Sequence, residues 1–493
     1  MTVDHLPRRA PDTGLANRDA GYFEFQGTRR AHWDAMAEAG WDRRGMGGAY
    51  HTRLAAVFQL VIPPGLRVLD LGCGGGDLLA ALEPAAGVGV DFSGVTLERA
   101  RARHPDLNFV EGDIHELDLG ETFDVILLSD LINDVWDVQA ILETVARHST
   151  PRTRVVMNFF SLMWKEPLTV ARRLGLATPL LPQNWLTRDD VNNLLGLVGL
   201  ETVREWDEVL LPLNIPVLGG LANRYLVKVP PFSFFALSHI VVARPAPQPI
   251  ARDNPPRVSV VVAARNEAGH IEDIFARTPD MGAGTELVFV EGHSSDDTCG
   301  AIERVMADNP ERDVKLFRQP GKGKGDAVRK GFAEASGDVL MILDADMTVA
   351  PEDLPRFYDA LIDGKGEFIN GVRLVYPMEA QAMQFLNLLA NKFFGLAFSW
   401  ILGQSIKDTL CGTKVMWRWE YERIAANRHY FGEFDPFGDF DLIFGADKLS
   451  MKIVDMPIRY RARVYGETNI SRWSHGWLLL KMMIFAALRI KFV

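Results

Sequence analysis

Cysteine is scarce in this sequence, which contains only Cys73, Cys299 and Cys411 among its 493 residues. The three lie far apart, so they form neither a metal-ligand motif nor a redox-active pair. An apolar signal core is also missing from residues 1–5. We therefore expect the protein to work in a reducing, cytoplasmic setting.

The sequence also lacks an uncharged apolar run of about 20 residues, the length that a transmembrane helix needs. It has no surplus of basic charge either: 53 basic residues stand against 64 acidic ones, a net charge of −11. This balance argues against a general nucleic-acid partner, although it leaves room for local basic patches. Because the chain is too long for one ordinary core, we expect a folded, soluble protein of two domains.

Proline is concentrated in residues 245–256, where no apolar periodicity is found. Such a segment is extended and semi-rigid. We therefore predict a domain of residues 1–247, a linker of residues 248–256 and a second domain of residues 257–493.

The first domain has the pattern of an α/β sheet with a ligand loop. Residues 67–79 predict an apolar strand that runs into a glycine-rich turn and a helix, and glycine lets a backbone approach a ligand closely. The next strand pattern ends in Asp91, where an acid can accept hydrogen bonds from ribose hydroxyls. Another strand pattern ends in Asp113, and a fourth covers residues 123–129. The polar and aromatic residues 1–60 look like a lid or prelude.

This succession resembles the class I S-adenosylmethionine-dependent methyltransferases over about residues 50–245, with a Rossmann-like sheet. The resemblance implies a set of residues for the cofactor S-adenosylmethionine. Asp70, Gly72 and Gly74 would lie under its methionine and ribose. Asp91 would hold the ribose hydroxyls, and Asp113 with Ile114 would flank the adenine.

The methyl acceptor stays open in the sequence. Neither an Asn-Pro-Pro-Tyr signature nor a reactive cysteine pair is present, which favours a hydroxyl, a carboxyl or a small amine as acceptor. Asp130 and Asp134 follow the fourth strand, where an acceptor would bind. Either could act as a base, but we favour helix N-capping as their role.

Polar residues follow the strand patterns of the second domain in the same way. Residues 258–264 lead to Asn266 and Glu267, and the uncharged run 339–343 leads to Asp344 and Asp346. A run of that kind predicts a strand buried on both faces, and ligands bind at the carboxyl edge of such sheets. Carboxylates there can offer hard oxygen ligands to Mg²⁺ or Mn²⁺ while the metal bridges a diphosphate. The glycine run of residues 321–329 does not have Walker A spacing.

The order of these motifs resembles the inverting GT-A family 2 glycosyltransferases over about residues 257–475. The resemblance implies that Glu267 and Glu291 contact the base and ribose of a nucleotide-diphosphate sugar, and that Asp346 binds the metal together with Asp344. Glu291 stands where the family usually has Asp, which leaves UDP and GDP both open. The implied nucleotide-sugar-binding residues are Ala264, Asn266, Glu267, Glu291, Lys324, Asp326, Asp344, Ala345 and Asp346.

Later segments resemble the polyprenyl-phosphate mannosyl- and glucosyltransferase branch of that family. They are residues 371–373, 408–414, 437–441 and 461–469. The resemblance implies that Arg373 and Arg461 bind the acceptor phosphate, and Arg472 can replace a lysine that the family carries at the position of Asn469. The implied catalytic residues are Asp344, Asp346, Asp439, Asp441 and Arg373.

Residues 385–402 and 477–491 are apolar segments interrupted by a few cations. Such helices lie in a membrane interface more readily than they span a bilayer. The alternative is that they are amphipathic helices packed on the protein's own core.

The sequence thus predicts a bifunctional α/β enzyme, peripheral on the inner face of a membrane. One domain would move a sugar from a GDP-mannose or UDP-glucose type donor to a polyprenyl phosphate, and the other would be a methyltransferase. One rival is a methyltransferase whose sugar-nucleotide module no longer transfers. Another is a glycosyltransferase that acts on a hydroxyl and needs a base.

Overall fold

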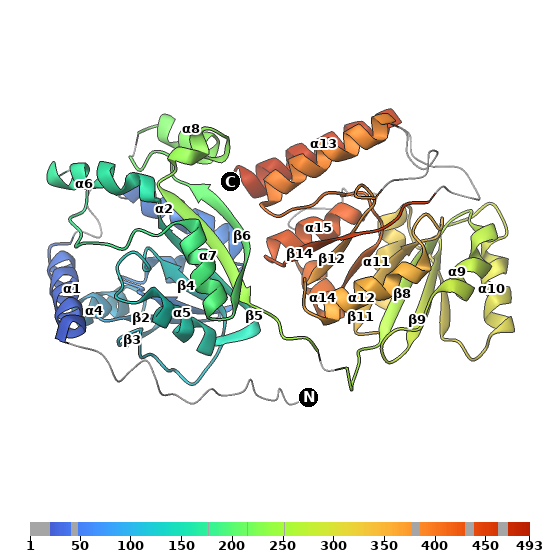
Figure 1. Ribbon diagram of the computed structural model, residues 1–493, viewed down its shortest axis with the longest axis horizontal. Coiled ribbons are helices and arrows are strands. Elements are labelled where there is room, and N and C mark those ends of the chain that lie inside the picture. Colours follow the sequence, from blue (N-terminus) through green and yellow to red (C-terminus); the bar gives the residue numbers. More distant parts are fainter. Residues whose placement is uncertain are drawn as a thin grey trace. The chain divides into compact units, whose positions relative to one another are not determined.

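The computed structural model describes residues 20–40, 48–175, 177–213, 215–250, 252–376, 385–428, 438–461 and 472–493, without the side chains of 385–387 and 472–475. The chain divides into two compact units, Met1–Pro245 and Ala246–Val493 (Figure 1). The division falls inside the proline-rich segment, and the bounds of the linker within that segment stay a prediction.

The first unit is built on a seven-stranded sheet with the order β3-β2-β1-β4-β5-β7-β6. All its pairs are parallel except those of β7, which runs antiparallel to both β5 and β6. The strands are β1 Arg67–Leu71, β2 Ala86–Asp91, β3 Asn108–Glu111, β4 Phe123–Ser129, β5 Ser149–Phe160, β6 Leu200–Glu208 and β7 Ser238–Pro245.

Helices cover both faces of this sheet (Figure 1). One core joins β1 and β4 to α5 and α7, and the other joins them to α2 and α3. Asp137 caps α5, and Thr187 with Asp190 forms a capping box at the start of α7. The α-helices are α1 Ala20–Glu38, α2 Gly48–Val61, α3 Asp77–Ala81, α4 Gly94–Arg103, α5 Val138–Arg147, α6 Lys165–Arg173, α7 Arg188–Leu197 and α8 Leu218–Arg224. Short 3-10 turns are η3 Leu162–Trp164, η4 Leu226–Lys228 and η5 Phe232–Phe235.

The second unit has a mixed seven-stranded sheet with the order β10-β9-β8-β11-β13-β12-β14. Strands β8 to β11 run parallel, whereas β13 is antiparallel to both of its neighbours, β11 and β12. The strands are β8 Val258–Ala264, β9 Thr285–Glu291, β10 Val314–Arg318, β11 Val339–Asp344, β12 Phe368–Val372, β13 Lys414–Trp417 and β14 Ile453–Pro457.

Strand β11 lies at the centre of this unit and is buried on both faces, as its uncharged sequence predicts. Leu340 and Ile342 belong to the core under α11 and α13 to α16, while Met341 and Leu343 belong to the core under α9, α10 and α12. The α-helices are α9 Ile271–Arg277, α10 Thr298–Asp308, α11 Lys324–Glu334, α12 Leu354–Ile362, α13 Phe385–Leu402, α14 Arg418–Ala426, α15 Asp439–Lys448 and α16 Arg472–Ala486. The predicted fold class, two α/β domains with amphipathic helices at the carboxyl end, is confirmed.

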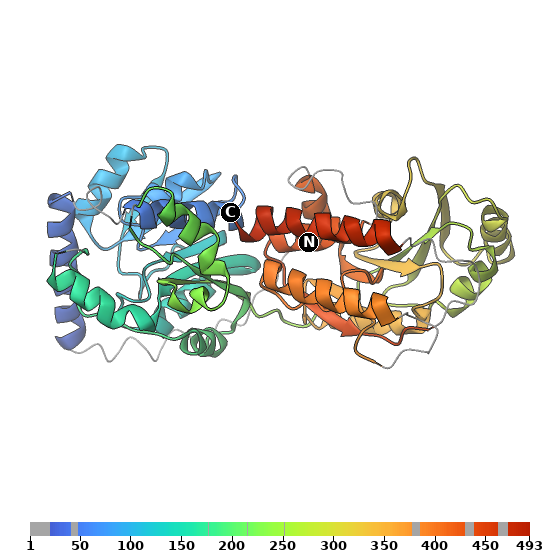
Figure 2. The ribbon, with the colours of Figure 1, turned by 90° about the horizontal axis from the view of Figure 1, so that it is seen from above.

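Helices α13 and α16 lie side by side on the second unit (Figure 2). Each buries one face, with Phe398 and Met482 almost fully covered, and exposes the other, with Leu396 and Trp477 open to solvent. Within the described ranges, no helix has both the length and the hydropathy needed to cross a membrane.

Candidate functional site

The glycine loop after β1 and the acid after β2 form one structure in the first unit. Gly72 and Gly74 have φ values of 71° and 52°, a region that favours glycine, and a side chain at Gly72 would collide with Leu131. The backbone nitrogens of Gly74 and Ser93 donate to the two Asp91 carboxylate oxygens, over 3.0 and 2.9 Å. The structure therefore brings the predicted loop residues and Asp91 together.

Asp70 lies beside this loop at the end of β1 and is only 2% exposed. Its Oδ1 atom is buried without a hydrogen-bond partner. Burial and the nearby Asp91 charge raise the pKa of Asp70 to about 8. An unpartnered buried oxygen among positive-φ glycines fits a site that receives a polar ligand such as the predicted cofactor.

Asp113 follows β3 and is covered by helix α1. Its carboxylate accepts hydrogen bonds from His115 Nδ1 at 2.8 Å and from the hydroxyl of Tyr22 on α1. Burial opposes ionisation, but these hydrogen bonds lower the pKa of Asp113 to about 2. Ile114, predicted beside the adenine, is buried next to it.

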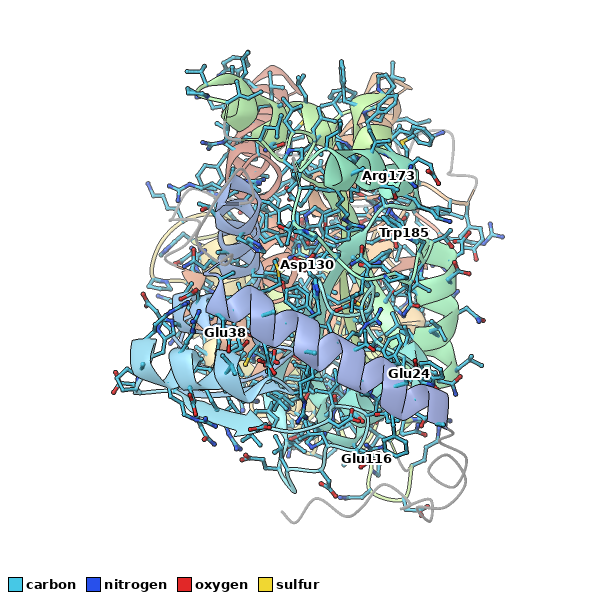
Figure 3. All side chains as sticks on the ribbon, turned by 90° about the vertical axis from the view of Figure 1, so that its left-hand side faces the viewer. Glu24, Glu38, Glu116, Asp130, Arg173 and Trp185 are labelled. Carbon is cyan, nitrogen blue, oxygen red and sulfur yellow. The ribbon has the colours of Figure 1, made fainter. Side chains whose placement is uncertain are left out.

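Figure 3 shows helix α1 between the labelled Glu24 and Glu38, on the side of the unit where Asp130 is also labelled. Two of its side chains hold Asp134: Arg29 Nε lies 3.1 Å and Trp33 Nε1 2.9 Å from the carboxylate oxygens. Helix α1 belongs to residues 1–60, for which the sequence predicts a lid or prelude, and that role stays a prediction. The sequence pointed to Tyr22 only as one of the aromatic residues of the first sixty, and it did not single out Arg29, because neither stands in a recognisable motif.

The N-capping role expected of Asp130 and Asp134 is wrong, because Asp137 caps α5. Asp130 instead lies at φ 56°, and its Oδ1 accepts from the Tyr50 hydroxyl at 2.5 Å and from Asn158 Nδ2 at 2.6 Å. No hydrogen bond to its Oδ2 is found in the described part of the chain. Burial raises the pKa of Asp130. Tyr50 and Asn158 thus fix the Asp130 carboxylate through Oδ1, and Oδ2 can contact a bound substrate.

The centre of the second unit's site is an ion pair at the end of β11. Lys324 Nζ lies 2.5 Å from Asp344 Oδ1, and a side chain at Gly412 would collide with both. Burial opposes both charges, but their attraction raises the pKa of Lys324 and lowers that of Asp344. Asp346 Oδ1 accepts from the Thr348 hydroxyl at 2.7 Å. Between the two carboxylates, Ala345 is buried.

The residues predicted for the nucleotide follow the neighbouring strands. The strand register places Ala264 opposite Glu291, and Asp344 opposite Ala263. Asn266 Oδ1 accepts from the Ser295 nitrogen at 2.7 Å. The remaining acids are also engaged: Glu267 with His270 at 2.9 Å, Glu291 with the Ser294 nitrogen, and Asp326 with the Gly321 nitrogen at 2.8 Å.

The candidate base residues lie at the start of α15 and are paired with cations. Lys414 Nζ lies 3.0 Å from Asp439 Oδ1, with both side chains almost completely buried. Arg428 Nε lies 2.7 Å from Asp441 Oδ2. Gly438 is packed so closely on Gly325, near the start of α11, that a side chain there would collide with it. This contact brings Asp439 to the Lys324 side of the site.

The predicted phosphate-binding arginines differ in their surroundings. Arg373 forms a bidentate pair with Asp408, over 2.7 and 2.9 Å, and lies over the Tyr460 ring. Arg461 is exposed, and its backbone nitrogen donates to the Thr348 oxygen. The side chain of Arg472 and all of residues 462–471 lie outside the described structure, as does Phe437.

The described residues contain no group of three or more His, Cys, Asp or Glu side chains that could hold a metal. A metal on a diphosphate needs only one or two protein carboxylates, because phosphates and water complete its shell. The pair Asp344 and Asp346 fits that smaller requirement.

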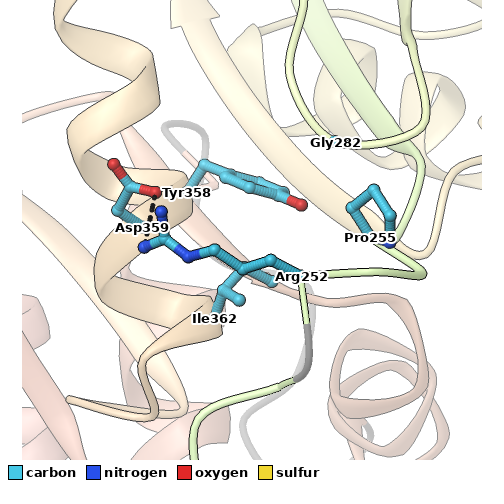
Figure 4. A pocket seen from close by; sticks show the side chains of 6 residues that line it. All are labelled: Arg252, Pro255, Gly282, Tyr358, Asp359 and Ile362. Atoms are coloured by element: carbon cyan, nitrogen blue, oxygen red, sulfur yellow. Dashed lines mark ion pairs between the residues drawn. The ribbon is translucent and has the colours of Figure 1, made fainter.

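A pocket in the second unit lies away from these residues (Figure 4). Arg252 and Pro255 precede β8 and Gly282 precedes β9, so the pocket is at the amino ends of these strands. It is closed on the other side by α12, where Arg252 is 3.6 Å from Asp359. The pocket is therefore separate from the carboxyl edge that carries Asp344.

Comparisons with known proteins match a part of each unit. Residues 62–185 match a family model described as a methyltransferase domain, and residues 259–415 match one described as glycosyl transferase family 2. The chain joins a methyltransferase domain to a family 2 glycosyltransferase domain. Both resemblances predicted from the sequence are confirmed.

Two curated relatives of this chain are named as sugar transferases. A dolichol-phosphate mannosyltransferase of Pyrococcus furiosus is 29% identical over 220 residues, which are 43% of this chain and 59% of the relative. A dolichyl-phosphate hexose transferase of Haloferax volcanii is 27% identical over 228 residues, which are 46% of this chain and 92% of the relative. Among solved structures, glucosyl-3-phosphoglycerate synthase from Mycobacterium tuberculosis is 20% identical with a TM-score of 0.36, covering 48% of this chain and 81% of that one.

Proposed function

We propose that the glycosyltransferase domain moves a sugar from a nucleotide-diphosphate sugar, of the GDP-mannose or UDP-glucose type, to a polyprenyl phosphate. The observation that carries this proposal is the pair Asp344 and Asp346 at the end of a buried strand in a family 2 domain. The names of two matched relatives, a dolichol-phosphate mannosyltransferase and a dolichyl-phosphate hexose transferase, support the choice of acceptor.

On the donor side, Glu267, Glu291 and Asp326 line the place for the base and the sugar. Lys324 is positioned by Asp344 at 2.5 Å, so a cation is held where the diphosphate would lie. Asp346 with Asp344 would hold Mg²⁺ or Mn²⁺, which stabilises the leaving diphosphate when bound.

On the acceptor side, one phosphate oxygen attacks the anomeric carbon while the bond to the diphosphate breaks on the opposite face, so the configuration inverts. A phosphate monoester has a second pKa near ~6 and is already anionic at neutral pH. It needs cations to place it, for which Arg373 and Arg461 are the candidates. Asp439 is paired with the buried Lys414 and Asp441 with Arg428, which favours a phosphate over a hydroxyl acceptor because both candidate bases are engaged by cations.

We also propose that the methyltransferase domain uses S-adenosylmethionine, held by Asp70, Gly72, Gly74, Asp91, Asp113 and Ile114. A hydroxyl or amine acceptor must lose a proton, and Asp130 is placed to take it with its second oxygen. The acceptor atom attacks the methyl carbon while the carbon–sulfur bond breaks.

Both reactions are assigned to the cytoplasmic face of a membrane, with the protein bound peripherally. A polyprenyl acceptor is anchored in the bilayer, and α13 with α16 exposes apolar side chains together with cations.

Product mass spectrometry tests the glycosyl transfer. The full chain is incubated with GDP-mannose or UDP-glucose, Mg²⁺ or Mn²⁺, and a polyprenyl phosphate dispersed in detergent. We expect one glycosylated polyprenyl phosphate, and we expect Asp346→Asn to abolish it. If the lipid stays unmodified with every donor while the protein binds nucleotide, the domain is a binding module or uses another acceptor.

Calorimetry with S-adenosylhomocysteine tests the methyltransferase site. Asp91→Ala should weaken binding, because each lost charge-assisted hydrogen bond is worth about 1.5–3 kcal/mol. Asp189→Ala, which removes an exposed acid on α7, is the matched control. Unchanged affinity in folded Asp91→Ala would contradict the cofactor assignment.

A further inference from the structure

The methyltransferase unit exposes an apolar surface that its proposed chemistry does not use. We define the apolar cap as residues 162–174, which follow β5, and residues 215–235, which lie between β6 and β7. These two segments hold half of the large hydrophobic side chains that are exposed in the described part of the chain. The most open are Val217 at 75%, Phe234 at 71% and Leu174 at 67%. Exposed patches of this kind mark interaction surfaces.

The exposure is maintained by an ordered scaffold. Asn223 accepts hydrogen bonds from the Leu210 and Leu211 nitrogens at 2.8 Å and is itself buried. The Trp164 ring nitrogen donates to the Phe235 oxygen at 2.9 Å, which ties the two segments together. The apolar side chains therefore project from a fixed framework. Figures 1 and 3 show α6 and α8, the helices of the cap, at the same end of the unit.

The charge of the cap is opposite to that of the chain. The chain carries a net charge of −11, but the cap contains one acid, Glu166, against five cations. Three of those cations are exposed: Lys165, Arg173 and Arg224. Residues 167–186 and 209–238 contain no acidic residue at all, although the chain has 64. An apolar surface bordered by cations is complementary to an anionic lipid surface, where aromatic rings and long cationic side chains find both apolar and polar contacts.

The cap also lies at the edge of the sheet where the methyltransferase site is built. Strands β4 and β5 are parallel, and β6 has the same direction because both β5 and β6 are antiparallel to β7. The cap segments follow β5 and β6 at their carboxyl ends, and Asp130 follows β4 there. Asn158 of β5 donates to Asp130 at 2.6 Å.

We propose that the apolar cap docks the methyltransferase unit on an anionic phospholipid bilayer, independently of helices α13 and α16. The membrane then borders the side of the site that carries Asp130. The meaning of a membrane beside Asp130 rests on the proposed methyltransferase function, whereas docking itself requires no catalysis.

Vesicle flotation of the full chain tests the proposal. Vesicles contain equal parts of phosphatidylglycerol and phosphatidylcholine, or phosphatidylcholine alone. All proteins carry Leu396→Ser and Trp477→Ser, which remove apolar contacts from the exposed face of α13 and α16. In this background the cap should still bind the anionic vesicles, and adding Leu174→Ser, Val217→Ser and Phe234→Ser should lower the partition coefficient at least tenfold. Leu197→Ser, at a position that is 62% exposed on α7, is the matched control and should bind like the background.

A second variant tests the contribution of charge to vesicle binding separately from that of apolar contact. It changes only exposed cations, so it is less prone to a folding defect. Arg173→Glu with Arg224→Glu should lower binding to the anionic vesicles at least fivefold while leaving the melting temperature unchanged. Unchanged binding in this variant would overturn the choice of an anionic surface.

Three other results would overturn the proposal. They are a background protein that does not bind vesicles, a cap variant that binds as well as its background, and a dimer in solution that the cap substitutions convert to a monomer. The last result would identify the cap as an interface between copies of the chain. Sugar transfer to polyprenyl phosphate in detergent needs no vesicles, so its failure is seen separately.

Discussion

Asp70 is a residue whose charge state depends on the fold. Its carboxyl is buried, one oxygen has no partner, and its pKa is raised from 3.8 to about 8. The folded domain without cofactor therefore keeps this proton at neutral pH. The unfolded chain loses it above pH ~4.

We predict that binding of S-adenosylmethionine near pH 6.5 releases a proton from Asp70, because a cationic cofactor favours the carboxylate. Calorimetry in buffers of different ionisation enthalpy measures the number of protons released. Asp70→Asn should abolish this release, whereas Asp189→Asn should not. A release that persists in folded Asp70→Asn would assign the proton to another group.

The raised pKa of Asp70 also determines how the free energy of unfolding changes with pH. Between the unfolded pKa of 3.8 and the folded pKa of about 8, the folded state binds more protons, so the free energy of unfolding falls as pH rises. The contribution of Asp70 is constant above about pH 8. Denaturant titrations of Asp70→Asn should show a flatter pH dependence across that window.

Asp439 and Asp441 distinguish the two acceptor chemistries. We predict that Asp439→Asn and Asp441→Asn lower sugar transfer less than Asp346→Asn does, and that Arg373→Ala raises the acceptor KM. Removal of an essential general base typically costs about 10²–10⁴ in rate. Steady-state kinetics on the soluble, folded fraction provide the comparison.

The buried ion pair requires a stability control for this experiment. Asp439→Asn leaves Lys414 buried beside a neutral amide, and breaking such a pair costs about 3–5 kcal/mol of folding free energy. The double variant Lys414→Met with Asp439→Leu should recover part of that loss. A rate loss in Asp439→Asn as deep as that in Asp346→Asn, with donor binding intact, would indicate an essential base and a hydroxyl acceptor.

At the scale of elements, the sequences of α13 and α16 left two roles open, packing on the protein's own core and lying in a membrane interface. Each helix has one face that is buried in the core and one that is exposed. Phe398 and Met482 belong to the core of the unit, whereas Leu396 is 75% exposed and Trp477 is 58% exposed. Deleting α16 would therefore remove core side chains together with the proposed membrane face. Substitutions on single faces separate the two roles.

We predict that Leu396→Ser with Trp477→Ser weakens binding to anionic vesicles without lowering the melting temperature. Phe398→Ala should instead cost about 3–5 kcal/mol, because it leaves a cavity in the core. Flotation and thermal melts of both variants measure the two effects. If the exposed-face variant melts early, that face packs against protein and the membrane assignment of these helices fails.

At the scale of the whole molecule, the chain consists of two compact units with their own sheets and cores. We predict two calorimetric unfolding transitions that respond to different ligands. S-adenosylhomocysteine should stabilise one unit by about 2.7 kcal/mol at 100 times its Kd, and UDP or GDP should raise only the other transition. A single transition that both ligands raise would mean that the units unfold together.

The sequence by itself determined the class of each sheet and the edge of the sheet at which the candidate site residues lie. A run such as Val339–Asp344 carries no charge before its last residue, so it must be buried on both faces, and the acids that follow it must lie at the strand end. Hydrophobic period and strand-end chemistry are local properties. They can be read before any distant contact is known.

Only the tertiary structure decided which groups meet. Tyr22 hydrogen-bonds to Asp113, which lies 91 positions away in the sequence. Lys414 forms an ion pair with Asp439, and the residues next to them in the sequence do not predict that pair. Capping by Asp137, in place of Asp130, likewise depended on where α5 begins. The exposure of the apolar cap could not be predicted either, because an apolar residue in a sequence predicts burial. Only the fold shows which apolar side chains stay exposed. The charge state and the exposure of a side chain depend on the residues that folding brings next to it. Neither composition nor periodicity predicts which residues those are.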